Sequence, residues 1–267
     1  MRVSNRKLEL KQPEDQPAVD NDRLIVQSVM RALDLFEAFG QTGKSMSLGE
    51  IAKATGATKS ATQRIAHTLV RRGYLEVAPE GGLKPGKKIL DRSFDYLRLN
   101  GLVERAVPIV IELRRISNER VDLSLYDRTT IVYASRQQSK RETFYATLIG
   151  RRVPTFCSSG GRACLAALDE DEIEAVLAES DLRRITPKTI IDPTIIRQKI
   201  REARENSYAL GVEEALIGEI VIAAAILDRN GQPLGALHVA GSLSEWPIDE
   251  FCKKFSPLVI EAARALS

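Results

Sequence analysis

The sequence predicts an α+β fold in which a helical N-terminal part precedes a part built around a largely antiparallel sheet. Up to about Ser117, apolar residues recur at three- and four-residue spacing, the period of amphipathic helices. From Arg120 onward they alternate with polar residues in short runs, the period of strands, and helical runs separate these strands. A chain of 267 residues is long enough for one large or two ordinary domains.

The composition is typical of a soluble globular protein, with 43% hydrophobic and 28% charged residues. The net charge of +3 is too small to indicate what kind of partner the protein binds. That question depends on how charged residues are distributed along the chain. Three widely spaced cysteines, Cys157, Cys164 and Cys252, argue against a disulfide framework and fit a reducing cytosol. Neither a membrane span nor a secretory signal is predicted, and we expect a cytoplasmic protein.

The chain begins with a segment, residues 1–22, that mixes charges with prolines and shows no apolar period. It predicts a disordered arm. A helix is then predicted from Ser28 to a left-handed cap at Gly40. Its apolar face is expected to contain Val29, Leu33, Phe36 and Phe39.

The next segment predicts two short helices joined by a tight turn. Ser47 and Glu50 match a capping box, in which each side chain accepts a hydrogen bond from the other residue's backbone N–H. Gly56 supplies the positive φ that a sharp turn needs. Thr58 is a good N-cap for the second helix, Lys59 to Arg72.

This second helix has an apolar face and a face rich in hydrogen-bond donors, which can reach phosphate oxygens or base edges. No acidic residue occurs between Ile51 and Gly73. These features favour a recognition helix in the major groove of DNA over a solvated surface helix. The candidate DNA-binding residues are Lys59, Ser60, Gln63, Arg64, His67 and Arg71. Among them, Gln63 and Arg64 are the first choice for base or phosphate contact.

A hairpin is predicted directly after this helix, with strands at residues 74–77 and 83–86 around a Gly-containing turn. A hairpin in this place is a wing. Its candidate phosphate-binding residues are Lys84 and Lys87, followed by Lys88.

A helical period then predicts a linker helix that ends at Asn100-Gly101. It is followed by a helix from about Val103 to Ser117. Pro108 in this helix must lie near a first turn or at a kink.

The C-terminal part predicts a sheet interrupted by helices. Residues 121–126 alternate strictly and predict a half-buried strand, and Asn230-Gly231 predicts a hairpin. Strands are expected at residues 120–126, 131–135, 143–149, 208–214, 221–228 and 233–240. Helices are expected at residues 162–168, 169–179, 192–206 and 247–265.

Ser158-Ser159-Gly160-Gly161 precedes one of these helices and predicts an anion site. Backbone N–H groups at a helix start, with the positive end of the helix dipole, bind carboxylate or phosphate. The alternative for this segment is an ordinary N-cap, and the two have about equal weight on the residues alone.

Several short motifs follow one another from about Gln27 to the end of the chain, and although each is weak, their order is specific. Together they resemble the IclR family of bacterial transcriptional regulators. The motifs are residues 28–33 (SVMRAL), 47–65 (SLGEIAKATGATKSATQRI), 150–154 (GRRVP), 161–163 (GRA), 186–190 (TPKTI), 208–209 with 213–214 (YA, EE), and Gly218 before 222–224 (IAA).

The resemblance implies an N-terminal winged helix-turn-helix, a linker helix used in dimerisation and a C-terminal effector domain with a GAF-like sheet. The corresponding boundaries are residues 1–22 for the arm, 23–87 for the DNA-binding domain, 88–103 for the linker and 104–267 for the effector domain. It also implies homodimers that usually pair into dimers of dimers on palindromic operators in double-stranded DNA.

By position, the resemblance also implies that the Ser159 and Gly160 amides bind a small carboxylate effector. The remaining residues of this site would be Ser158, Gly161, Gly211, Glu219, Val221, His238 and Ala240. This chain departs from familiar members here, because two small polar residues common near His238 and Ala240 are replaced and Glu219 stands where an apolar residue is usual. We hypothesise that His238 and Glu219 select a ligand with an extra donor or a ring, such as an aromatic or hydroxylated acid. The alternative for Glu219 is that it faces solvent.

Enzyme functions are poorly supported. The two histidines, His67 and His238, accompany no G-x-S-x-G elbow, the cysteines lack the spacing of a zinc site, and no phosphate-binding P-loop motif occurs. No catalytic residue, metal or cofactor is predicted. The sequence therefore predicts a DNA-binding transcriptional regulator controlled by a small organic acid. Two alternatives stay open, a small-acid enzyme that uses the same pocket and a sensor whose helix-turn-helix binds protein.

Overall fold

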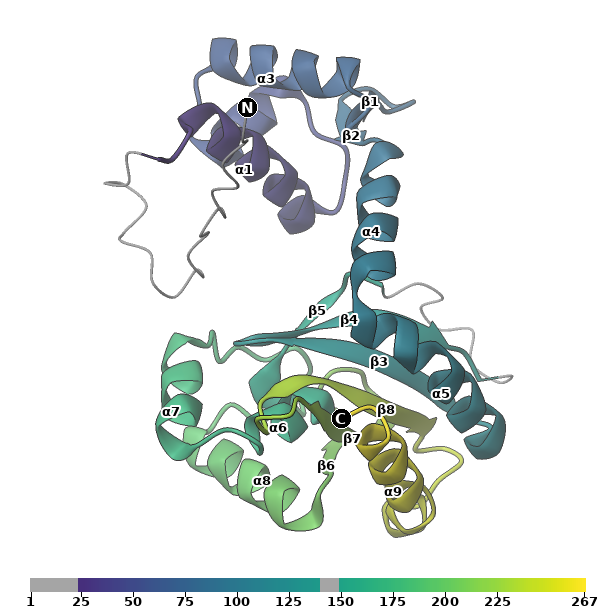
Figure 1. Ribbon diagram of the computed structural model, residues 1–267. Helices are drawn as coiled ribbons and strands as arrows, with labels where there is room; N and C mark the ends of the chain where they lie inside the picture. Colours follow the sequence, from purple (N-terminus) through teal and green to yellow (C-terminus); the bar gives the residue numbers. More distant parts are fainter. Residues whose placement is uncertain (1–23, 140–148) are drawn as a thin grey trace, which may run out of the picture. The chain divides into compact units, whose positions relative to one another are not determined.

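The computed structural model of the chain describes residues 24–139 and 149–267, and it confirms the predicted α+β class. Contacts within the chain divide it into two compact units, Met1–Arg92 and Ser93–Ser267 (Figure 1). The predicted arm, residues 1–22, lies outside the described residues.

The first unit consists of three helices and a two-stranded wing. Its elements are α1 (Gln27–Thr42), α2 (Leu48–Thr55), α3 (Lys59–Arg71), β1 (Leu75–Val77) and β2 (Leu83–Pro85). β1 and β2 pair antiparallel as predicted, and Met46 also pairs with Leu83, a bridge that the sequence did not predict. Leu35, Ile51 and Leu75 lie at the centre of the core.

The capping and turn signals of this unit are confirmed. The Ser47 hydroxyl accepts from the Glu50 backbone N–H at 3.2 Å, and the Glu50 carboxylate accepts from the Ser47 N–H at 2.7 Å. Gly56 has a φ of 65°, and the Thr58 hydroxyl caps α3 by accepting from the Ala61 N–H at 3.2 Å. These side chains satisfy N–H groups that the first turn of a helix leaves without a partner.

The prediction for the first helix was wrong in two respects. α1 continues past Gly40 to Thr42, and Gly43 is the left-handed cap, with a φ of 64°. Val29 and Leu33 are 54% and 51% exposed, whereas Leu35 is buried. Apolar residues occur on more than one side of α1, so helical spacing alone does not single out the face that packs against α2 and α3.

Two helices follow the wing. α4 (Lys88–Leu99) has no buried residue, and α5 (Gly101–Ser117) begins two residues earlier than predicted. The Asn100 side chain caps α5 by accepting from the Leu102 and Val103 N–H groups at 3.1 and 3.2 Å. Because of this early start, Pro108 lies inside α5 and not in its first turn.

The second unit is built around a six-stranded antiparallel sheet with the strand order β5-β4-β3-β8-β7-β6. The strands are β3 (Arg120–Asp127), β4 (Thr130–Gln137), β5 (Arg152–Pro154), β6 (Ala209–Val212), β7 (Glu219–Leu227) and β8 (Pro233–Ser242). The hairpin predicted at Asn230-Gly231 joins β7 and β8. The predicted strand 143–149 falls outside the described residues except for Ile149, which lies in a turn, and β5 was not predicted.

Four further helices belong to the described residues of this unit. They are α6 (Ser159–Leu165), α7 (Glu170–Glu179), α8 (Pro193–Asn206) and α9 (Ile248–Arg264), with a 3-10 turn, η3 (Thr155–Cys157), before α6. Of these, α6, α8 and α9 contact the sheet. α6 begins three residues earlier than predicted, at Ser159, so both glycines lie inside it. Within residues 24–139 and 149–267, no helix is long and apolar enough to cross a membrane.

Both faces of the central sheet are buried, which the alternating pattern did not predict. Val121, Leu123 and their neighbours pack against α5 and α9 in the main apolar core. The opposite face is covered by α6 (Figure 1). It carries Asp122 and Ser124, whose side chains are both fully buried. β3 is therefore a buried strand with one polar side and not a half-exposed one.

A buried ion pair holds α6 in place. Arg162 donates to both carboxylate oxygens of Glu214, at 2.6 and 2.8 Å, and to the Phe156 carbonyl at 2.8 Å. The two side chains are 1% and 6% exposed. Glu214 also accepts from the Ile190 backbone N–H at 3.2 Å, so one pair joins α6 to two loops of the unit.

We expect Arg162→Ala to lower the free energy of unfolding by about 3–5 kcal/mol, because Glu214 would remain as an uncompensated buried charge. Urea unfolding followed by circular dichroism measures this change. Arg197→Ala, which removes an exposed pair with Glu174, is the matched control and should cost far less, because water screens an exposed pair. Equal losses in the two variants would contradict this assignment.

Candidate functional site

α3 turns an apolar face to the core and a polar face to solvent. Thr62 and Ala66 are each 2% exposed and form the buried side. The residues predicted to bind DNA all have exposed side chains: Lys59, Ser60, Gln63, Arg64, His67 and Arg71. Since the helix carries no acidic residue, this exposed face is electropositive and rich in donors.

A groove of about 420 Å³ lies between α1 and α3. Arg31 of α1 and Arg64 of α3 both line it, together with the hydroxyl residues Ser28 and Thr68. No acidic side chain of the described residues lines the groove, so two guanidinium groups border one space. In the sequence, Ser28 and Arg31 were noted only as part of a family motif, and their place beside Arg64 in this groove was not predicted.

The wing lysines differ in their surroundings. Lys84 lies opposite Glu76 in the β1–β2 pair, and its ammonium group is 3.3 Å from the Glu76 carboxylate. Lys87 is exposed just beyond β2. Part of the positive charge at Lys84 is therefore offset within the wing.

The second candidate site lies on the polar face of the sheet. In the register of the strands, Gly211 of β6 is opposite Val221 of β7, Val221 is opposite Ala240 of β8, and Ala240 is opposite Arg120 of β3. Opposed residues in antiparallel strands project to the same side. Glu219 and His238 lie two residues from Val221 and Ala240 on their strands and share this face.

The first turn of α6 approaches this face closely. The Ser158 hydroxyl accepts from the Gly161 N–H at 3.2 Å, so these two residues close the turn themselves. The N–H groups of Ser159 and Gly160 belong to the turn in which a helix offers no internal acceptor. A side chain at Gly160 would place its Cβ 2.2 Å from Cε1 of His238, and one at Gly211 would lie 3.7 Å from the Ser159 nitrogen.

His238 is a buried, neutral histidine. It is 1% exposed, and its Nε2 lies 2.8 Å from the Ser124 hydroxyl, while its Nδ1 has no hydrogen-bond partner among the described residues. The Tyr133 ring centroid lies 5.5 Å away. Burial lowers the pKa of His238 to about 4, although Asp122 opposes this shift. At pH 7 the imidazole therefore contributes hydrogen bonding and not charge.

Four charged side chains surround His238 in a buried network. Asp122 accepts from Arg120 Nε at 3.0 Å and from Arg136 Nε at 2.7 Å, and Arg120 also donates to Glu219 at 2.5 Å. Burial acts to lower the pKa of Arg120, but the two carboxylates outweigh it and raise that pKa. Among the described residues, this network therefore contains two positive and two negative groups.

The solvent-facing alternative for Glu219 was wrong. Its side chain is 12% exposed and pairs with Arg120, whose own side chain is 5% exposed. The reason is that β7 pairs with β8 on one side and β6 on the other, which places Glu219 inside the sheet next to a buried arginine. The sequence signal for this pair was the presence of the charged residues Arg120 and Asp122 at alternate positions of the strand.

The structure thus brings all nine predicted effector residues into one region. Two cysteines lie beside it, because Cys157 directly precedes Ser158 and Cys164 is part of α6. Burial raises the pKa of Cys157 to about 12 and raises that of Cys164 further, so both thiols are poor nucleophiles. In the described ranges, no group of His, Cys, Asp and Glu residues is arranged to hold a metal ion.

The lowered pKa of His238 has a consequence for stability. An unfolded histidine titrates near pH 6.5 and the folded one near pH 4, so the unfolded state binds more protons between these values. The contribution of His238 to the free energy of unfolding is therefore fully present above about pH 6.5. It is lost as the pH drops towards 4, with a slope approaching about 1.4 kcal/mol per pH unit. We expect His238→Gln to remove this contribution. Urea unfolding between pH 7.5 and 4.5 tests it, and parallel pH profiles for both proteins would contradict it.

Comparisons with known proteins agree with this architecture. A family model for the IclR helix-turn-helix domain matches residues 28–79, and one for the C-terminal domain of the bacterial transcriptional regulator IclR matches residues 94–267. The transcriptional repressor IclR of Escherichia coli K12 is 26% identical over 245 residues, which cover 91% of this chain and 89% of the repressor.

Solved structures show the same fold. A transcriptional regulator from Rhodococcus sp. RHA1 is 27% identical with a TM-score of 0.77, over 91% of this chain and 97% of that one. An IclR homolog from Microbacterium hydrocarbonoxydans, solved in complex with 4-hydroxybenzoate, is 20% identical with a TM-score of 0.73, over 90% and 97% of the chains. The two family models together match most of the chain. The protein therefore belongs to the IclR family of bacterial transcriptional regulators and carries its DNA-binding helix-turn-helix.

Proposed function

We propose that the chain binds a palindromic operator through α3 and the wing, and that a small organic acid at the first turn of α6 modulates this binding. The observation that carries the effector part is the close approach of Ser159 and Gly160 to the buried polar face of the sheet. In this proposal residues 23–87 bind DNA, residues 88–103 are the linker and residues 104–267 bind the effector.

On the DNA side, the exposed face of α3 enters the major groove. Gln63 and Arg64 contact bases or phosphates, and Lys84 and Lys87 of the wing neutralise the backbone. The groove shared by Arg31 and Arg64 supports a further phosphate contact from α1, because both guanidinium groups border it without a lining carboxylate.

On the effector side, the ligand carboxylate accepts from the Ser159 and Gly160 N–H groups. His238 Nδ1 and the Tyr133 ring then favour a ligand with a hydroxyl group or an aromatic ring, since Nδ1 is buried without a partner among the described residues. The complex of the Microbacterium hydrocarbonoxydans homolog with 4-hydroxybenzoate supports this class of acid.

The exposed apolar residues of α4 support dimerisation through the linker. Leu90, Phe94 and Leu99 are 68%, 63% and 77% exposed, which is unusual for large apolar side chains on one short helix. A homodimer presents two recognition helices, which suits a palindromic operator, and a dimer of dimers in the cytoplasm follows the family pattern.

We expect Arg64→Ala to weaken binding to DNA that carries the promoter of a flanking gene. If Arg64 contacts a phosphate, the slope of log affinity against log salt should also become shallower by about 0.9. Fluorescence anisotropy at several salt concentrations measures both quantities. Arg229→Ala, at an exposed turn of the other unit, is the control and should bind like the unmodified chain. Unaltered binding by Arg64→Ala would refute the placement of α3 on DNA.

Replacing His238 tests the effector site. With 4-hydroxybenzoate as the probe, the melting temperature of the unmodified chain should rise, because a ligand that binds the folded state stabilises it. His238→Ala should reduce this rise, whereas His67→Ala, on α3, should keep it. An equal ligand-induced rise in both variants, measured by differential scanning fluorimetry, would count against the role of His238.

A further inference from the structure

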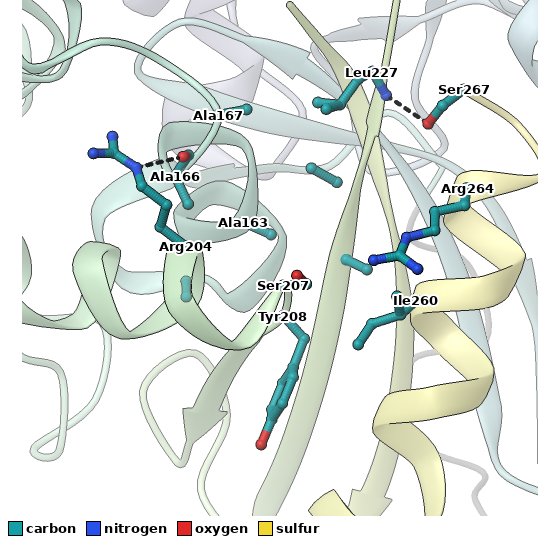
Figure 2. Close-up of a pocket in the computed structure, with 13 residues that line it drawn as sticks. Ala163, Ala166, Ala167, Arg204, Ser207, Tyr208, Leu227, Ile260, Arg264 and Ser267 are labelled. Atoms are coloured by element: carbon teal, nitrogen blue, oxygen red, sulfur yellow. Dashed lines mark hydrogen bonds between the residues drawn. The ribbon is translucent and has the colours of Figure 1, made fainter. Parts of the chain in front are cut away.

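A cavity lies in the C-terminal unit, beyond the C-terminal half of α6. It has a volume of about 340 Å³ and is bordered by α6, α8, β7 and α9 (Figure 2). This size is at the lower end of the range for small-molecule sites and is sufficient for a ligand of about one aromatic ring.

The floor of the cavity consists of alanine side chains from three elements. Ala163 of α6, Ala166 just after its end, Ala203 of α8 and Ala225 of β7 pack together there. A methyl group is the smallest apolar side chain, so these positions leave space between elements that larger residues would fill. The result is a shallow apolar surface on which a flat ring can lie.

A positive group borders this apolar floor. Figure 2 shows Arg264 reaching from α9 towards β7 beside Ile260. In residues 24–139 and 149–267, no carboxylate side chain lines the cavity, and Arg264 has no ion pair. The hydroxyl group of Ser207, at the end of α8, also borders it.

The other arginine of the cavity is already engaged. Arg204 pairs with Glu170 at 2.8 Å and donates to the Ala166 and Leu168 carbonyls at 2.9 and 2.8 Å. Figure 2 shows its side chain turned towards Ala166. An incoming anion can therefore pair with the Arg264 guanidinium without displacing an existing partner among the described residues.

We propose that this cavity is a second ligand site, which binds a small aromatic monocarboxylate. The ring lies on the alanine floor, and the carboxylate pairs with the Arg264 guanidinium, with Ser207 as a neighbouring hydroxyl donor. Guanidinium binds carboxylate with favourable planar geometry, and apolar contact with a flat floor favours a ring over a hydrated ion.

The two ends of α6 connect this cavity to the site proposed for the effector. Ala163 lines the cavity, and Gly160, one turn earlier on the same helix, fits tightly against His238. A ligand on the alanine floor therefore biases the position of α6 and the affinity of the first site, and the first ligand biases the second equally. This coupling rests on the proposed function, because it requires a ligand at the first turn of α6. Binding in the cavity is independent of that function.

A fluorine-19 NMR titration of the full chain with 4-fluorobenzoate tests the proposal. We expect a bound population that Arg264→Gln weakens about ten-fold, since this change removes the charge and keeps the size of the side chain. Ala225→Leu, which fills the floor, should weaken the same population. Arg201→Gln, at an exposed arginine of α8, is the matched control and should leave it unchanged.

His238→Ala separates the two sites. The population that depends on Arg264 should persist in this variant, even if the site at the first turn of α6 binds nothing. No binding of 4-fluorobenzoate, or binding that neither Arg264→Gln nor Ala225→Leu weakens, would overturn the proposal. If His238→Ala abolished all binding while Arg264→Gln and Ala225→Leu did not weaken it, the ligand would belong to the first site, and the proposal would also be overturned.

Discussion

The C-terminal unit depends on the buried pair between Arg162 and Glu214. The sequence places two glycines in the first turn of α6, where glycine weakens a helix, and the helix has only seven residues. Such a segment needs tertiary contacts to persist. The bidentate ion pair, with additional bonds to the Phe156 carbonyl and the Ile190 N–H, supplies them and holds α6 against the sheet.

The glycines themselves follow from this packing. A Cβ at Gly161 would lie 2.2 Å from the Thr155 Cα, and one at Gly160 would meet the His238 ring at the same distance. The close approach puts the first-turn N–H groups of α6 beside the polar face of the sheet. The glycines lower the helix propensity of α6, and the buried ion pair compensates for this loss. Together they allow backbone N–H donors to lie within a buried site.

Local signals in the sequence predicted the helix-turn-helix well because its structure is determined locally. The capping box at Ser47 and Glu50 and the left-handed turn at Gly56 require neighbours within a few residues. Burial of the second sheet face could not be predicted in this way. The alternation at Asp122 and Ser124 shows that β3 has two different faces, but whether α6 or water covers the polar one depends on residues more than thirty positions away. The family resemblance predicted the effector residues, whereas the ion pair of Arg120 with Glu219 could be found only from the strand register.

The chemistry of the buried face favours selection by hydrogen bonding over selection by charge. Among the described residues, Arg120 and Arg136 pair with Asp122 and Glu219, and His238 is neutral at pH 7. The proposed attraction for an anion therefore comes mainly from the α6 N–H groups, which any small carboxylate can use. Discrimination between carboxylates then depends on His238 Nδ1, because a ligand that leaves a buried polar atom without a partner loses about 1–3 kcal/mol relative to one that bonds it. In the proposed site, His238 therefore sets which acid is preferred, and the α6 N–H groups anchor its carboxylate.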